Sequence, residues 1–350
     1  MKRSWYVFIM VVAVLAGCLP SQEKSVEWPY GVKYEIFVMS YADGDGDGKG
    51  DFKGLTARLD EIRDLGVNGI WLMPIMPSDT YHKYHVTDYK NIDPDYGTLD
   101  DFKKFIVEAH SRDIKVITDF VINHTGNNHR WFLDAVKSET SPYRDYYVWA
   151  NKDSIRNELF KKDKALDSDN IRKWHAVNND TTSEHYYGYF NGLCPDLNLD
   201  NPEVKKQIVD IARFWLEEVK VDGFRMDAAK HIFPDERAND NHAFWVWFKN
   251  EMEAIKPDVY LVGEVWSESK EVAPYLEGLP SLFNFDLGYA ITDVAKAGRD
   301  SLGIVQRYKA IRDYYKSITE DYLDATFIKN HDQTRLLTEL DGDINKAKMA

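Results

Sequence analysis

Apolar runs alternate along the chain with segments of helical spacing. Seven runs have the length and composition of strands: 32–39, 69–73, 115–122, 221–226, 259–265, 282–285 and 325–329. The segments 54–65, 99–111, 202–219, 242–255 and 291–318 carry apolar residues at helical intervals. Because the strands are apolar on both faces and mostly separated by helices, the pattern predicts an α/β fold with a parallel sheet covered by helices.

Two arrangements of such a sheet fit the pattern, a doubly wound sheet and a (β/α)8 TIM barrel. Polar residues follow nearly every strand, as expected of the loops at the C-terminal face of a barrel. The stretch 125–198 is polar, aromatic and irregular, which predicts an inserted domain after the third strand. With seven strands before Ala350, we expect a barrel truncated before its eighth strand. The expected division is a signal segment (1–17), a linker (18–29), a first barrel part (30–124), the insertion (125–198) and a second barrel part (199–350).

Composition narrows the class of protein. The 350 residues include 44 Lys and Arg against 58 Asp and Glu, for a formal net charge of −14. This acidic balance argues against a nucleic-acid partner, which is bound through clustered Lys and Arg. Hydrophobic residues make up 44%, which excludes intrinsic disorder. The aromatic share of 14% is high for a core alone and is compatible with a sugar-binding cleft.

The N-terminus has the pattern of an export signal. Lys2 and Arg3 precede an apolar run over 5–16, which is shorter than the roughly 20 residues that span a bilayer. The run ends in Leu-Ala-Gly-Cys at 15–18, which resembles the bacterial lipobox; the alternative is an ordinary signal peptide with a chance cysteine. The resemblance implies cleavage before Cys18, lipid on its thiol, and a protein exported and anchored to the membrane or cell surface of a bacterium. Cys194 is then the one unmodified thiol, which leaves no disulfide within the chain.

The strand 221–226 leads into a candidate nucleophile. Arg225 and Asp227 are two residues apart, so their side chains project to the same side. A guanidinium beside a carboxylate keeps that carboxylate ionised, as a nucleophile requires. The alternative is a structural ion pair at the end of a strand.

Three further strands end in polar groups. Glu264 follows an apolar strand, where a raised carboxyl pKa would suit a general acid; a helix-capping or surface glutamate is the alternative. His331 and Asp332 follow the last strand, where the alternative is a polar loop. Asp119 and Asn123 lie on one side of the strand 115–122, where a hydrogen-bonded strand terminus would also explain them. Asp227, Glu264 and Asp332 thus follow three different strands of one sheet, and such carboxylates are what glycosidic cleavage needs.

These four segments resemble, in the same order, the four signature regions of the α-amylase family, glycoside hydrolase family 13. The resemblance extends from Tyr30 to the chain end and implies a retaining mechanism through a covalent glycosyl-enzyme, with the two main carboxyls about 5–5.5 Å apart. By this resemblance Asp227 is the nucleophile, Glu264 the acid and base, and Asp332 the residue that stabilises the transition state. The implied substrate contacts are His82 and Tyr84 (from a Tyr-His-x-Tyr segment), His124, Arg225, Lys230, His231 and His331.

The segment 43–51 carries four aspartates at alternating spacing and begins like an EF-hand loop. Its twelfth position is Gly54, where an EF-hand needs a bidentate glutamate, so that interpretation fails. The carboxylates would still repel one another strongly without a cation. The segment resembles a Ca²⁺-binding loop of oligo-1,6-glucosidases, which implies the ligands Asp43, Asp45, Asp47, the backbone carbonyl of Lys49, and Asp51.

A second metal site is implied by the α-amylases, which bind Ca²⁺ between barrel and insertion. Its ligands correspond to Asn123, Asp196 and the backbone carbonyl of His231. The oligo-1,6-glucosidase group lacks this site, so the resemblance leaves it open.

Substrate preference has mixed signals. Lys230 and His231 resemble the α-amylase pair on the leaving-group side, and Ala228 stands where α-1,6-specific enzymes typically carry Val. The segment Cys-Pro-Asp-Leu-Asn at 194–198 is closer to the oligo-1,6-glucosidase group, although its cysteine departs from both. We expect an endo-acting enzyme on the α-1,4 bonds of starch, glycogen or malto-oligosaccharides. The alternatives are an exo-acting α-glucosidase or oligo-1,6-glucosidase, a transglycosylase, and a non-catalytic glycan-binding lipoprotein.

Overall fold

The computed structural model describes residues 27–159, 172–177 and 184–350, of which 32–350 form one compact unit. The predicted signal segment (1–17) and Cys18 lie outside the described residues. Within the described ranges, every helix is too short or too polar to cross a membrane.

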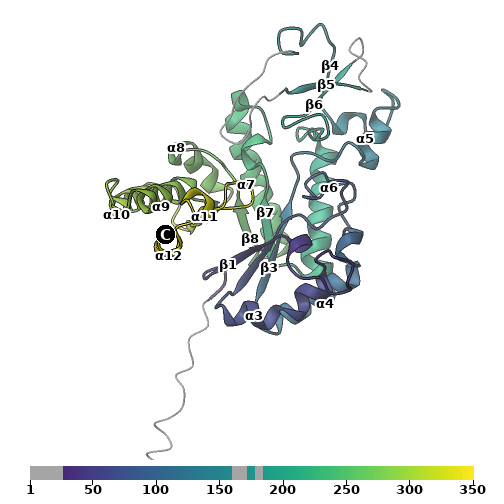
Figure 1. Ribbon diagram of the computed structural model, residues 1–350. Helices are drawn as coiled ribbons and strands as arrows, with labels where there is room; N and C mark the ends of the chain where they lie inside the picture. Colours follow the sequence, from purple (N-terminus) through teal and green to yellow (C-terminus); the bar gives the residue numbers. More distant parts are fainter. Residues whose placement is uncertain (1–26, 160–171, 178–183) are drawn as a thin grey trace, which may run out of the picture. The chain divides into compact units, whose positions relative to one another are not determined.

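A seven-stranded parallel sheet forms the centre of this unit (Figure 1). Its strands are β1 (Lys33–Ile36), β2 (Gly69–Leu72), β3 (Lys115–Phe120), β7 (Gly223–Met226), β8 (Tyr260–Gly263), β9 (Ser281–Phe283) and β10 (Leu323–Ala325). They are neighbours in that same order, each pairing with the next along the chain. A doubly wound sheet would reverse its order part-way, whereas a barrel keeps one direction. The fold is therefore that of a (β/α)8 barrel, represented here by seven parallel strands.

The register of the sheet brings polar side chains to one face. Glu35 is paired with Trp71, and Trp71 with Ile117. Asp119 lies two residues beyond Ile117 and is paired with Arg225. Because paired residues of parallel strands project to the same side and residues two apart share a face, these side chains all point into the barrel interior.

Helices cover the outside of the sheet. The main ones are α2 (Phe52–Ala57), α3 (Leu59–Asp64), α4 (Leu99–His110), α6 (Pro202–Arg213), α7 (Ala238–Ile255), α9 (Phe285–Ala297) and α10 (Ile304–Lys316), with short α8 (Ser269–Val272), α11 (Leu336–Glu339) and α12 (Ile344–Met349). Thr98 starts α4 with a reciprocal capping box to Asp101, and Asn201 caps α6 ahead of Pro202. Buried Phe102, Phe105 and similar residues on these helices complete the core.

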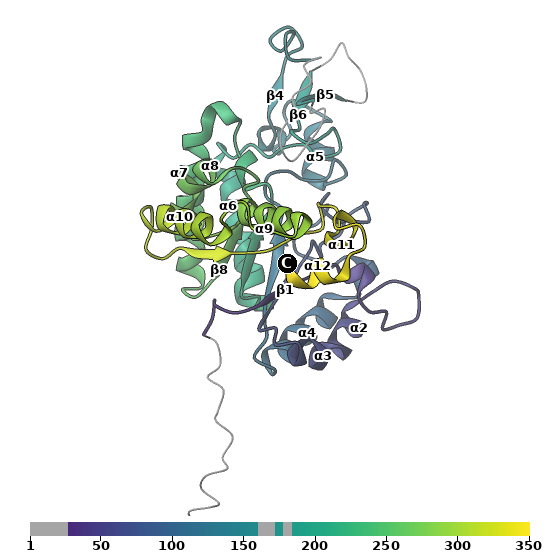
Figure 2. The same cartoon turned by 60° about the vertical axis from the view of Figure 1, so that its left-hand side comes forward.

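The stretch predicted as an insertion holds a separate three-stranded antiparallel sheet and a short helix. The strands β4 (Trp149–Ala150), β6 (His185–Tyr187) and β5 (Trp174–Ala176) pair in that order, and α5 (Arg130–Ala135) lies beside them (Figures 1 and 2). The stretch leaves and rejoins the barrel at one point, because His124 and Asp196 form an isolated bridge. The Leu197 amide donates to the Asn123 carbonyl at 2.8 Å and closes this neck.

Two predicted strands are displaced in the structure. The strand predicted at 325–329 is instead Leu323–Ala325, because the Phe327 ring packs edge-on against Phe283 and Phe285 and accounts for the apolar run beyond the strand. The strand predicted at 282–285 ends at Phe283, since Asn284 caps α9 by accepting from the Leu287 amide at 3.0 Å.

The predicted helix 291–318 is two helices, α9 and α10. Gly298 and Gly303 adopt φ values of 64° and 65°, a left-handed conformation that ends one helix and precedes the next. Helix 54–65 is likewise divided into α2 and α3 at Arg58, whose φ of −102° and ψ of 2° are not helical.

Candidate active site

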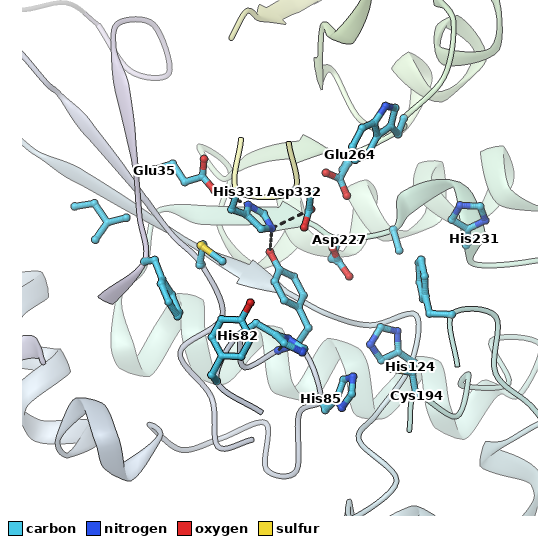
Figure 3. Close-up of a pocket in the computed structure, with 18 of the residues that line it drawn as sticks. Glu35, His82, His85, His124, Cys194, Asp227, His231, Glu264, His331 and Asp332 are labelled. Carbon is cyan, nitrogen blue, oxygen red and sulfur yellow. Dashed lines mark hydrogen bonds and ion pairs between the residues drawn. The ribbon is translucent and has the colours of Figure 1, made fainter. Parts of the chain in front are cut away.

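A pocket of about 1180 Å³ lies at the C-terminal ends of the strands. It is lined by residues from both ends of the chain and from the insertion, and Figure 3 shows the carboxyl groups of Asp227, Glu264 and Asp332 turned toward one another. The other lining residues include Tyr34, Glu35, Phe37, Tyr41, Tyr81, His82, Tyr84, His85, His124, Phe190, Cys194, Lys230, His231, Trp266, His331 and Arg335.

The centre of the site is the guanidinium of Arg225, which is fully buried. Its Nη1 donates to Oδ1 of Asp119 and to Oδ1 of Asp227, each at 2.7 Å. Its Nη2 lies 2.7 Å from Oε1 of Glu264, an ion pair without hydrogen-bond geometry. Asp227 therefore receives a hydrogen bond that stabilises its anion, whereas Glu264 does not receive one from this group.

Burial is the largest influence on the pKa values of Glu264 and Asp227. It raises the pKa of Glu264 to about 7, assisted by the charges of Asp227 and Asp332 and opposed by Arg225. Burial also raises the pKa of Asp227, opposed by the charge of Arg225 and by its hydrogen bond. A carboxyl with a pKa near 7 can hold a proton and release it, which is the requirement for a general acid that becomes a base.

The backbone beside the candidate nucleophile is in an unusual conformation. Ala228 has φ of 49°, in the left-handed region that non-glycine residues rarely adopt. The turn leads directly into residues 229–231, where the Ala229 amide donates to the Glu264 carbonyl at 3.1 Å. Strain of this kind is concentrated at functional sites, where the surrounding structure maintains it.

A second cluster surrounds His331. Its Nδ1 lies 2.6 Å from Oε1 of Glu35, and its Nε2 lies 2.8 Å from the hydroxyl of Tyr84 and 3.1 Å from Oδ2 of Asp332 (Figure 3). Burial opposes the charge on this ring, but the hydrogen bonds to Asp332 and Glu35 outweigh it and raise the pKa of His331 to about 10. His331 is therefore an imidazolium at neutral pH.

Sequence reasoning assigned no role to two residues that the structure places in this network. Asp119 binds Arg225 through one oxygen, while its other oxygen accepts from the Tyr84 hydroxyl and the Trp71 indole, both at 3.1 Å. The sequence shows its position on one side of a strand, but its partners come from segments far away in the sequence. Glu35 left only one signal, an acidic residue within the predicted strand 32–39.

The other residues predicted to contact sugar lie around the same pocket. The His124 ring is buried, with Nδ1 3.0 Å from Asn123 Oδ1 and with no hydrogen-bond partner for Nε2 among the described residues. His82 lies beside Tyr84, with ring centroids 5.8 Å apart. At the opposite side, Lys230 forms an ion pair with Glu271 at 2.9 Å, and the His231 ring stacks on Tyr189 at 3.9 Å. Cys194 is buried and free.

The acidic loop brings three of its four predicted carboxylate ligands together. Asp43, Asp45 and Asp51 have oxygens within 4.8 Å of one another, a hard oxygen donor set that fits Ca²⁺. Asp47 does not belong to this group, and its Oδ1 accepts from the Lys49 amide at 2.8 Å. A Cβ at Gly54 would lie 2.1 Å from the Ala42 carbonyl oxygen, which explains why the EF-hand glutamate has no counterpart here.

The residues of the second predicted metal site are also neighbours. The Asn123 amide donates to the His231 carbonyl at 2.5 Å, and a hydrogen bond from the same side chain reaches Asp196. Burial raises the pKa of Asp196 to about 8. The three groups therefore satisfy one another through the Asn123 amide, and the donor set contains a single carboxylate.

Comparison with known proteins identifies this arrangement. The catalytic-domain profile of the α-amylase family, described as "Alpha amylase, catalytic domain", matches residues 35–350. The chain belongs to the α-amylase family. The matched range includes the seven strands of the parallel sheet, except for the first two residues of β1. It also includes Asp227, Glu264 and Asp332.

Several members of the α-amylase family are similar over almost the whole chain. α-Amylase 3 of Dictyoglomus thermophilum is 44% identical over 317 residues, covering 91% of this chain and 59% of that protein. The 4-α-glucanotransferase of Thermotoga neapolitana is 36% identical over 318 residues, covering 91% and 66%. The crystal structure of an α-amylase from H. orenii superimposes with a TM-score of 0.81 at 48% identity, covering 91% of this chain and 64% of that one. The chain thus spans about three fifths to two thirds of the length of these relatives.

Proposed function

We propose that this chain carries the catalytic centre of a retaining glycoside hydrolase that cleaves α-1,4-glucosidic bonds in starch, glycogen or malto-oligosaccharides. The observation that carries the proposal is the unequal support that one buried guanidinium gives to two carboxyls. Arg225 hydrogen-bonds Asp227 but only ion-pairs with Glu264. The first group is suited to attack as an anion, and the second to hold the proton.

The reaction would proceed in two displacements. In the first, the carboxylate of Asp227 forms a bond to the anomeric carbon, while Glu264 gives its proton to the glycosidic oxygen as the bond to the leaving sugar breaks. In the second, the ionised Glu264 takes a proton from water, and the water oxygen replaces Asp227 at the anomeric carbon. Asp332, beside the imidazolium of His331, would stabilise the positive charge that develops on the sugar ring in the transition state of each step.

The ring positions support a sugar in this pocket. Tyr84 and His331 stack at 5.6 Å with an interplanar angle of 15°, and His124, which lines the pocket, has an Nε2 without a hydrogen-bond partner among the described residues. Lys230 and His231 would contact the leaving-group side.

The relatives include an enzyme named as an amylase and one named as a glucanotransferase, so water and a second sugar are both candidate acceptors. Hydrolysis is the preferred proposal, and transfer the alternative. Product analysis on starch, maltose and isomaltose separates endo-hydrolysis, exo-hydrolysis, α-1,6 cleavage and transfer, since only transfer lengthens the substrate.

The direct test is the release of reducing sugar from soluble starch by wild type, Glu264→Gln and Glu268→Gln. Glu268 is exposed and four residues away, so its substitution is a matched control. Loss of the general acid lowers kcat by about 10²–10⁴-fold in Glu264→Gln, whereas Glu268→Gln retains wild-type activity. If wild type and Glu264→Gln release equally little sugar while both bind starch, the protein is a glycan-binding module instead.

Ca²⁺ is the proposed structural ion. Asp43, Asp45 and Asp51 would hold it in the loop 43–51, which does not line the pocket, and it would offset the repulsion among these acids. It would order the loop and take no part in bond cleavage. Asn123, Asp196 and the carbonyl of His231 form the weaker candidate, because a single carboxylate supplies little of the charge that Ca²⁺ sites use.

Export and lipid anchoring at Cys18 form a separate proposal that rests on the N-terminal sequence pattern alone. Incorporation of labelled fatty acid into wild type, and its loss in Cys18→Ser, would support it. Equal labelling of both proteins, or of neither, would contradict it.

A further inference from the structure

Lys83 is the residue between the two predicted sugar contacts His82 and Tyr84, and its side chain is buried away from solvent. Its ammonium lies 2.9 Å from Oδ1 of Asp93 and 2.8 Å from Oδ2 of Asp95, and only 4% of the side chain is exposed. A lysine is rarely buried to this extent unless it is paired, so these contacts fix the middle of the loop.

The backbone of Lys83 supports this interpretation. Its φ is 65°, in the left-handed region where glycine is favoured and a Cβ is costly. Here a side chain is present at a position whose backbone favours glycine. The side chain must therefore offset the conformational cost, and its ion pairs with buried Asp93 and partly buried Asp95 are contacts able to do so.

Each of the two acidic partners of Lys83 also binds a second group, in a different loop. Asp93 Oδ2 accepts from the Ser78 amide at 3.1 Å, and Ser78 forms a bridge with Val86 that closes the loop 78–86. Asp95 Oδ1 accepts from the Lys49 ammonium at 2.6 Å. Lys49 belongs to the acidic loop 43–51. A continuous chain of alternating charges thus runs from the acidic loop to the loop that carries His82 and Tyr84.

The position of Lys83 affects the active site through its neighbour Tyr84. Its hydroxyl donates to Asp119 Oδ2 at 3.1 Å and lies 2.8 Å from His331 Nε2, so its placement sets the contacts of both. Because Lys83 and Tyr84 are adjacent, a movement of the Lys83 backbone displaces this hydroxyl.

We propose that Lys83 is the positioning residue of the sugar-binding loop 78–86, and that the ion-pair chain Lys49–Asp95–Lys83 makes the order of this loop depend on the order of the acidic loop 43–51. The proposal rests on the proposed function, because it assigns the loop to sugar binding. It concerns neither bond cleavage nor direct contact between Lys83 and substrate.

Lys83→Gly separates the role of the side chain from that of the backbone. Glycine relieves the left-handed strain, so a purely local backbone role predicts equal or higher thermal stability and unchanged kinetics. A positioning role predicts a fall in kcat/KM on malto-oligosaccharides of tenfold or more, with at least part of the loss in KM, and recovery in Lys83→Arg. Lys220 is the matched control, an exposed lysine with φ of 74° for which Lys220→Gly leaves the kinetics unchanged. Wild-type kinetics in Lys83→Gly would overturn the proposal, whereas an inactive wild type would instead overturn the proposed function.

Hydrogen exchange measured with and without added CaCl₂ tests the coupling even where Lys83→Gly fails to fold. In wild type, Ca²⁺ slows amide exchange in both 43–51 and 78–86. In Lys49→Met, whose parent side chain is 45% exposed and tolerant of change, the slowing persists in 43–51 and is lost in 78–86. Slowing of 78–86 in Lys49→Met to the wild-type extent, or its absence in wild type, would contradict the coupling.

Discussion

His331, which follows the last strand of the sheet, lies with its Nδ1 2.6 Å from Oε1 of Glu35 on the first strand. The contact joins residues 296 positions apart in the sequence. It fixes which nitrogen of the ring faces Glu35 and leaves Nε2 to face Tyr84 and Asp332.

Glu35→Gln therefore makes the pH dependence of stability weaker. The pKa of His331 is raised to about 10, so its stabilising charge is fully present below its ordinary pKa of 6.5 and is lost as the pH rises through 10. Removing the Glu35 charge should cost about 1.5–3 kcal/mol of unfolding free energy at pH 6, and less as the pH approaches 10. Urea unfolding at pH 6, 8 and 10 measures this, with Glu268→Gln as control. A difference from wild type that does not change with pH would contradict the assignment.

The pH profile of activity should carry an alkaline limb near pH 7. Glu264 must be protonated to act as the acid, and burial raises its pKa to about 7. Consequently kcat/KM falls about tenfold for each pH unit above this value. Initial rates on malto-oligosaccharides between pH 4 and 10 measure the limb. A limb near pH 10 would point to His331 as the titrating group.

Asp119→Asn should lower kcat without unfolding the protein. The amide keeps the size of the side chain but removes the charge that holds Arg225 and accepts from Tyr84. Misplacement of the Arg225 guanidinium then displaces the candidate nucleophile, a change that costs up to about 10²-fold. Steady-state kinetics with a circular dichroism melt measure the two effects separately. Asp113→Asn, an exposed substitution outside the pocket, should leave both unchanged.

Much of the fold could be predicted from the sequence, because its strands are continuous apolar runs whose order sets their neighbours. Strand ends were less predictable. At Phe327 an apolar ring packs against other rings beyond the strand, so the periodic pattern extends past the ladder of hydrogen bonds. Gly298 and Gly303 were the available signals for a broken helix.

The candidate site was predictable where the interacting residues are close in the sequence, as Arg225 and Asp227 are. Glu35 and Asp119 were not assigned, because each acquires its role from partners more than 30 residues distant: His331 for Glu35, and Arg225, Tyr84 and Trp71 for Asp119. Asp47 was expected to join the other acids of its loop but is not part of their group, because alternating spacing does not fix where each carboxylate points.

Ca²⁺ should raise the melting temperature, and the chelator EDTA should lower it. At a free Ca²⁺ concentration 100 times Kd, binding to the folded state adds about 2.7 kcal/mol of stability. Asp45→Asn should abolish most of this gain, because it removes one of three clustered carboxylates. Thermal melts in CaCl₂ and in EDTA test this, with exposed Asp210→Asn as control. A melting curve that is the same in both conditions would contradict a calcium site.

The neck of the insertion, where His124 pairs with Asp196, separates the stretch that forms one wall of the pocket from the sheet that carries the carboxyl groups. Since the inserted stretch begins and ends at one bridged pair, its length places no demand on the spacing of the barrel strands. A different stretch closed by the same pair would give the pocket a new wall above an unchanged set of carboxyls. The inserted stretch can therefore vary and change which substrates fit the pocket, while the carboxyl groups remain on the sheet.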